Sequence, residues 1–149
     1  MKLASHERVV VEAIPFDADW SRVRLYRSEC GGVAGWLRRL VLQASRHRAI
    51  ALGNHVFLPD RCEGDLGVLA HELTHCAQYQ AWGPVAYFTR GAVTQLQASL
   101  HRRLRIGSNP YQYQMQPGKP LRAYGMEQQA QIVEDRYRGA MEDHAIPSA

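Results

Sequence analysis

The segment spanning residues 65–81 constrains this chain most, because its residues divide into two faces when they are placed on a helix. A helix turns by about 100° per residue, and this rotation gathers the apolar side chains of the segment on one side: Leu66, Leu69, Ala70, Leu73, Cys76 and Ala77. His71 and His75 are one turn apart and lie away from that stripe. The pattern predicts a helix that packs against a core with one face and presents two histidines on the other.

The segment His71–His75 has the residue types and spacing of a catalytic zinc site. Two imidazoles four residues apart on a helix can bind one Zn²⁺ ion, and Glu72 stands beside them. Zinc lowers the pKa of a bound water from about 15.7 to about 7, so hydroxide becomes available at neutral pH. Glu72 is the predicted catalytic base, which takes a proton from this water and passes it to the leaving amine.

A catalytic zinc usually has three protein ligands and one open position, so a third ligand is required. Six residues beyond His75 the chain has Ala81 instead of a histidine, which favours a carboxylate from a later helix. Glu127 and Glu134 are the candidates, because they lie two turns apart on nearly the same bearing of a helix predicted from Met126 to Asp143. Helical geometry alone leaves both open.

The N-terminal half carries the β signals. Val9–Ile14 is a β-branched run and Val23–Arg27 alternates apolar and polar residues, so both are predicted strands. The runs 49–52 and 55–58 flank Gly53 and Asn54, and this pattern predicts a hairpin with a two-residue turn.

Helices and one loop account for the rest of the chain. A helix is predicted over 33–45, and a second over 65–81 with Asp65 as its cap. Gly83 and Pro84 should separate that helix from another over 85–105. Residues 107–119 are rich in Gln, Pro, Gly and Tyr and are predicted to form a loop before the last helix. These elements predict an α+β fold, with a small N-terminal sheet and about three main helices, in a single domain over residues 1–149.

Composition excludes several classes of protein. The net charge is +4, but no recognition motif accompanies the arginines, so nucleic acid is not an expected partner. An acidic partner protein or the anionic bacterial envelope would suit the charge equally well. No apolar run approaches the roughly 18 residues of a membrane span, and no signal peptide is readable at the N-terminus. Three cysteines are too few for a disulfide framework and are expected to be free thiols.

Residues 50–137 resemble a group of bacterial zincin-like toxin domains that are attached to Rhs-type proteins and to type VI secretion spikes. The matching features are Leu52–Leu58, His71–His75 with Gln78 and Tyr79, and Glu127–Ala130 with Ile132, Val133 and Asp135. The resemblance implies a minimal zincin metallopeptidase domain in which Glu127 is the third zinc ligand. Asn109, Pro110 and Tyr111 resemble the start of another zincin block, but Gln112 replaces the ligand glutamate of that block, which again favours Glu127.

The same resemblance implies an antibacterial effector that a secretion apparatus delivers into a target cell, where the periplasm is one expected site of action. The expected partners are a protein or peptide substrate, an immunity protein and a carrier belonging to the secretion apparatus. Two alternatives stay open. One is a non-catalytic, zinc-stabilised module of a secretion or phage-tail-like apparatus, and the other is an amide hydrolase of peptidoglycan.

Several residues are candidates for supporting roles around the zinc. Gln131 and Asp135 are candidate partners for the second ring nitrogen of a zinc-binding histidine. Tyr111, Tyr113 and Tyr124 are candidates for stabilising the oxyanion, and packing is the alternative role for all three. Zincin resemblance also implies that an edge strand pairs with an extended substrate. His55 and the strand that it begins, His55–Leu58, are the candidates, unless the hairpin only completes the sheet.

Overall fold

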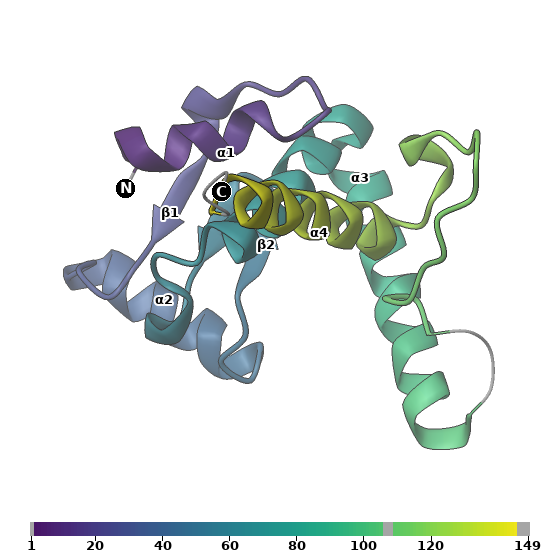
Figure 1. The fold of residues 1–149 in the computed structure, drawn as a ribbon. Coiled ribbons are helices and arrows are strands. Elements are labelled where there is room, and N and C mark those ends of the chain that lie inside the picture. The colour runs from purple at the N-terminus through teal and green to yellow at the C-terminus, as the bar shows by residue number, and fades with distance from the viewer. Residues whose placement is uncertain (1, 106–108, 146–149) are drawn as a thin grey trace.

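The computed structural model describes residues 2–105 and 109–145 and shows a mostly helical α+β fold, as the sequence predicts (Figure 1). The described part contains four α-helices: α1 (Arg8–Glu12), α2 (Gly32–Ala44), α3 (Leu66–Leu104) and α4 (Met126–Ala145). It also contains three short strands, β1 (Arg24–Tyr26), β2 (Ile50–Leu52) and β3 (His55–Phe57). Single 3₁₀ turns lie before α1 at Ser5–Glu7 and between later elements at Trp20–Arg22, Asp60–Cys62 and Leu121–Ala123.

The three strands form one sheet in the order β1-β3-β2. β2 and β3 form the predicted antiparallel hairpin, and Gly53 in its turn has a φ of +64°, which glycine adopts without steric penalty. β1 pairs with β3 in parallel. β3 is therefore the central strand, and the prediction that His55–Leu58 forms an edge is wrong. The edge beside the histidines is β2, because β1 occupies the other side of β3.

The N-terminal segment is helical, so the strand predicted at Val9–Ile14 is wrong. Val10 and Ile14 are four residues apart and both enter the hydrophobic core, whereas Val9 is 55% exposed. β-Branched residues disfavour a helix only weakly, and burying this pair outweighs that preference. Glu7, itself buried, forms an ion pair with Arg27 just beyond β1 and holds the segment against the sheet.

Helix α3 is two helical segments joined at Gly83, as the Gly83-Pro84 signal predicts. Gly83 has φ 78° and ψ 166°, a conformation that is almost restricted to glycine, and Pro84 begins the second segment. Asp65 caps the first segment by accepting a hydrogen bond from the Val68 N–H at 3.0 Å. The second segment projects away from the body of the molecule (Figure 1).

The first segment of α3 lies at the centre of the fold, between the sheet and α4. The core joins side chains from α1, the three strands, α3 and α4: Val10, Ile14, Val23, Leu25, Ala51, Val56, Leu58, Leu69, Ala70, Leu73, Cys76, Val133 and Tyr137. Cys76 is a buried free thiol and Cys30 and Cys62 are also free, as predicted. The predicted loop over 107–119 is irregular from residue 109 onward, and residues 107–108 lie outside the described residues. Within the described ranges, no helix has the length and hydropathy needed to cross a membrane.

Candidate metal centre

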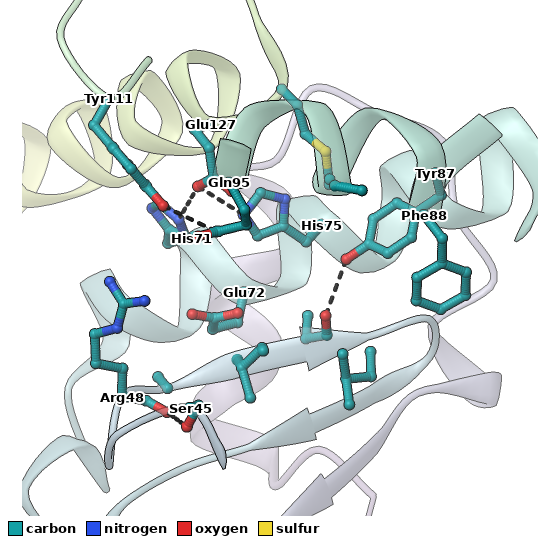
Figure 2. A pocket seen from close by; sticks show the side chains of 17 residues that line it. Ser45, Arg48, His71, Glu72, His75, Tyr87, Phe88, Gln95, Tyr111 and Glu127 are labelled. Carbon is teal, nitrogen blue, oxygen red and sulfur yellow. Dashed lines mark hydrogen bonds and ion pairs between the residues drawn. The ribbon is translucent and has the colours of Figure 1, made fainter. Parts of the chain in front are cut away.

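Three side chains from two helices converge on one point beside the sheet (Figure 2). His71 and His75 come from the first segment of α3, and Glu127 comes from the first turn of α4. Glu127 Oε2 lies 3.5 Å from His71 Nε2 and 3.4 Å from His75 Nε2. One potential ligand atom from each residue lies within 4.8 Å of the other two, a separation that one ion can bridge.

A buried amide network fixes the start of α4 against His75. Gln78 Nε2 donates to the carbonyl of Met126 at 3.0 Å and to Gln129 Oε1 at 3.1 Å. Because this nitrogen faces two acceptors, the other amide atom is the oxygen, and it accepts from His75 Nδ1 at 2.8 Å. His75 therefore carries its proton on Nδ1 and directs the lone pair of Nε2 toward Glu127.

Glu134 takes the corresponding position beside His71. Its Oε2 atom lies 3.2 Å from His71 Nδ1, a distance that allows charge interaction although the ring N–H does not meet the angle of a hydrogen bond. Arg138 pairs with both Glu134 and Asp65 at 2.9 Å, and so connects α4 to the cap of α3. Glu127 and Glu134 thus lie on opposite sides of the His71 ring, and only Glu127 reaches both histidines.

The charges of this cluster depend on one another. Burial alone lowers the pKa of His71, but Glu127 and Glu134 outweigh it and raise that pKa to about 10. Burial raises the pKa of Glu127, but His71 and His75 outweigh it and hold that pKa well below its usual range. Without a metal, the centre is therefore an ion pair between a protonated His71 and an ionised Glu127.

Glu72 faces the same cavity from beneath the histidines (Figure 2). Its side chain is buried, and its Oε2 atom has no hydrogen-bond partner among the described residues. Burial raises the pKa of this carboxyl, while the nearby histidines and the backbone N–H of Ala51 act in the opposite direction. An unpaired buried carboxylate oxygen normally requires a partner, and a water held by a metal ion would supply one. Two histidines, a glutamate and this oxygen together fit a catalytic zinc site.

The cavity at the centre has a volume of about 300 Å³ and lies between β2 and the second segment of α3. Tyr87 reaches across from that segment and donates its hydroxyl to the Ala51 carbonyl at 3.0 Å. The N–H of Ala51 is already beside Glu72. Both backbone groups that β2 directs away from β3 at this residue therefore have partners within the protein, which leaves no free pairing position for a substrate strand at Ala51.

Of the residues predicted to contact substrate or the oxyanion, some line the cavity and others lie outside it. Tyr111 lines the cavity, and its hydroxyl accepts a hydrogen bond from Gln95 at 3.1 Å. Tyr124 is outside the lining, and its hydroxyl accepts from the backbone N–H of Gln116 at 2.9 Å. His55 is also outside the lining and is bonded to Tyr26 through Nδ1 at 3.0 Å.

The predicted histidine partners, Gln131 and Asp135, bond to each other at 2.9 Å. Asp135 also accepts from the Tyr113 hydroxyl at 2.6 Å. In the structure, Gln78 lies beside Nδ1 of His75 and Glu134 lies beside Nδ1 of His71, where Gln131 and Asp135 were expected. Gln78 follows His75 by three residues on the same helix, and this spacing is the signal that would have identified it from the sequence.

Residues 12–83 are similar to the eCIS core domain, where eCIS stands for extracellular contractile injection system. The matched segment includes the sheet, His71, Glu72 and His75, and it ends at the bend in α3. Glu127 lies beyond it. No curated protein and no solved structure matches the chain. The similarity agrees with the expected link to a secretion apparatus, whereas attachment to Rhs-type or type VI proteins stays a prediction.

Proposed function

We propose that this protein is a zinc-dependent metallopeptidase associated with a contractile injection apparatus. One observation carries the proposal: Glu127 from α4 meets both α3 histidines, and the buried, unpaired carboxylate oxygen of Glu72 faces the same cavity. Two histidines and one glutamate are a ligand set of catalytic zinc sites, and they leave a fourth position open. A site that serves only for folding has no chemical need for Glu72.

In the proposed reaction, His71, His75 and Glu127 would hold the metal, the two histidines through their Nε2 atoms and the glutamate through its carboxylate. Gln78 keeps His75 in the tautomer that offers Nε2, and Glu134 orients the His71 ring. When bound, zinc supplies the Lewis acidity that makes water reactive at neutral pH.

Glu72 takes a proton from the attacking water and transfers it to the amine that leaves when the peptide C–N bond breaks. A raised pKa suits a carboxyl that must both accept and donate a proton near neutral pH. Tyr111 is the candidate donor to the oxyanion. Because Gln95 donates to its oxygen, the hydroxyl hydrogen of Tyr111 is free to point into the cavity.

The similarity to the eCIS core domain supports a place in an injection apparatus. We propose that the apparatus carries the protein into a target cell, where it acts as an antibacterial toxin on protein or peptide substrates. An immunity protein in the producing cell would then be required. Toxicity should differ between cytoplasmic and periplasmic expression, and it should disappear with Glu72→Gln.

The direct test combines zinc content with peptide cleavage. We expect about one zinc per chain, and a peptide library should be cleaved by the parent protein and not after chelation. Glu72→Gln should retain zinc and lose cleavage by about 10²–10⁴-fold, the usual contribution of a general base. Glu127→Ala should lose zinc, whereas Glu134→Ala should retain it with weaker affinity by about 10–100-fold.

A second function is supported by the same similarity, because a protein of an injection apparatus can use zinc only for folding. In that case Glu72→Gln would leave zinc content, stability and biological activity unchanged, and no peptide would be cleaved. Digestion of muropeptides in parallel tests the third possibility, hydrolysis of an amide bond in peptidoglycan.

A further inference from the structure

The cavity has a basic end, and this end belongs to neither the metal centre nor the proposed proton transfer. Ser45 and Arg48 line the cavity together with His71 and Glu72. Figure 2 shows Arg48 rising from the connection between α2 and β2, below Tyr111. This positive group therefore lines the same cavity as the candidate metal ligands.

Arg48 differs from the arginines that stabilise the fold. Arg27, Arg38 and Arg138 each pair with a carboxylate of the protein. Arg48 forms no ion pair with any residue that the structure describes. A guanidinium that lines a cavity without an internal counter-ion can bind an external anion without first giving up a partner.

Two further arginines extend the positive charge outward from the cavity. Arg46, Arg48 and Arg102 line an adjoining hollow of about 330 Å³, which shares Ser45 and Gln95 with the main cavity. The residues described as lining this hollow include no acidic side chain. Like charges that converge without acidic neighbours repel one another and produce a positive potential that an anionic ligand relieves.

The backbone before Arg48 adopts an unusual conformation that places this residue beside the cavity. Arg46 and His47 both have a positive φ, at 57° and 56°, although neither is a glycine. His47 N–H donates to the Leu42 carbonyl at 2.6 Å, and the Ser45 hydroxyl lies 2.9 Å from the Arg48 carbonyl. Consecutive left-handed residues turn the chain sharply from α2 into β2, and Arg48 is the residue that this turn brings to the cavity.

We infer that the substrate carries a carboxylate beside the scissile bond and that Arg48 binds it. The inference rests on the proposed peptidase function, because it identifies the class of substrate for that site. Guanidinium binds carboxylate through two parallel N–H···O bonds, which give both affinity and orientation. The carboxylate belongs either to an Asp or Glu side chain or to the C-terminus of the substrate, and both have the same chemistry at Arg48.

The test uses the zinc-loaded protein and two matched sets of peptides. One set is amidated at the C-terminus and carries Asp, Asn or Ala at each position around the cleavage site. The other set has a free C-terminus and no internal acid. We expect a preference for Asp over Asn at one position in the first set, or for the free over the amidated end in the second, and the two sets distinguish the sources.

Arg48→Gln should reduce kcat/KM for the preferred acidic peptide by about 3–30-fold, the range expected for an exposed to partly buried charged hydrogen bond. Cleavage of the neutral peptide should change less than about twofold. Arg48→Lys should recover part of the loss, because it retains the charge without the planar guanidinium. Arg39→Gln, which removes an exposed arginine that lines a different hollow, is the matched control and should change neither peptide.

Binding to Glu72→Gln, measured by fluorescence anisotropy, separates this inference from the proposed activity. Arg48-dependent binding of acidic peptides without any cleavage by the parent protein would contradict the peptidase and leave the carboxylate site standing. Cleavage with equal rates for Asp and Asn peptides would overturn the carboxylate site and leave the peptidase standing. An equal loss for acidic and neutral peptides in Arg48→Gln would also overturn it.

Discussion

The two segments of α3 follow each other directly in the chain, but the first is largely buried and the second is largely exposed to solvent. In the first segment nearly every residue from Gly67 to Gln78 is buried, and Leu73 has no exposed surface. In the second segment Tyr87 and Ala98 are buried, while Val85 is 81% and Leu96 is 61% exposed. Gly83 divides the two.

This difference shows how a helix can serve both as a scaffold and as the wall of a cavity. The first segment is held on several sides by the sheet, α1 and α4, so its histidines have fixed positions. The second segment contacts β2 through Tyr87, whose hydroxyl donates to the Ala51 carbonyl, and contacts Tyr111 through Gln95. Its inner face lines the cavity with Gly91, Ala92 and Gln95, and its outer face is apolar and exposed.

The largest expected effect is a contrast in stability between leucines of the two segments. Leu73→Ala removes a fully buried side chain and should lower the free energy of unfolding by about 2–5 kcal/mol. Leu96→Ala removes an exposed side chain and should change it by less than about 0.5 kcal/mol. Urea unfolding followed by circular dichroism measures both. Equal destabilisation would mean that the second segment is packed against something in solution.

The bend between the segments gives the next effect. Gly83→Ala places a Cβ atom on a residue with φ 78° and ψ 166° and should lower the free energy of unfolding by about 1–3 kcal/mol. Because the bend also sets the wall of the cavity, peptide cleavage should fall while zinc content stays the same. Gly139→Ala, at a glycine of α4 that lies outside the cavity lining and has nothing within 4 Å of its Cβ position, is the matched control. An unchanged cleavage rate in Gly83→Ala would show that the bend does not position the wall.

Zinc binding should release a proton from His71, which lies in the first segment of α3. The pKa of His71 is raised to about 10 in the metal-free protein, so His71 holds a proton at neutral pH that zinc must displace. Zinc affinity should therefore rise about tenfold per pH unit around neutrality, or about 1.4 kcal/mol. Titration calorimetry in buffers of different ionisation enthalpy counts the protons. Leu96→Ala should show the same slope, and an affinity independent of pH would contradict the His71–Glu127 ion pair.

A small stabilising effect is expected from a substitution on the inner face of the second segment. Gly91→Ala should raise the free energy of unfolding by about 0.5–1 kcal/mol, because alanine favours a helix over glycine. Gly91→Leu should fold equally well, since nothing lies within 4 Å of the added Cβ, but it should fill the cavity and reduce cleavage of large peptides most. Thermal unfolding and a comparison of short with bulky peptides test the two effects.

Local signals were sufficient to predict much of this fold. The hairpin, the cap at Asp65, the break at Gly83 and the last helix all depend on neighbouring residues, and the structure confirms each. The strand predicted at Val9–Ile14 was wrong because burial of Val10 and Ile14 against distant residues decided that segment. The order of the strands also depends on a long-range pairing, between β1 and β3, that no local pattern reveals.

The candidate site also combines features that local spacing predicts with features that depend on long-range contacts. Helical spacing was sufficient to place the two histidines together, and the structure brings Glu127 to them. Helical spacing alone could not choose between Glu127 and Glu134, because both glutamates face His71 and the choice depends on where α4 begins relative to α3. The bonds of Gln78 to Met126 and Gln129 fix that register, and they join residues that are about 50 positions apart in the chain.

The separation of the histidines from Glu127 determines when the centre can become complete during synthesis. Glu127 follows His75 by 52 residues, so a ribosome exposes both histidines and Glu72 well before the residue that joins them. Folding of the N-terminal part alone would give a two-histidine pair with low affinity for zinc. For the peptidase proposed above, docking of α4 would be the step that completes the centre, and a chain that ended before Glu127 would lack the third proposed ligand and the proposed activity.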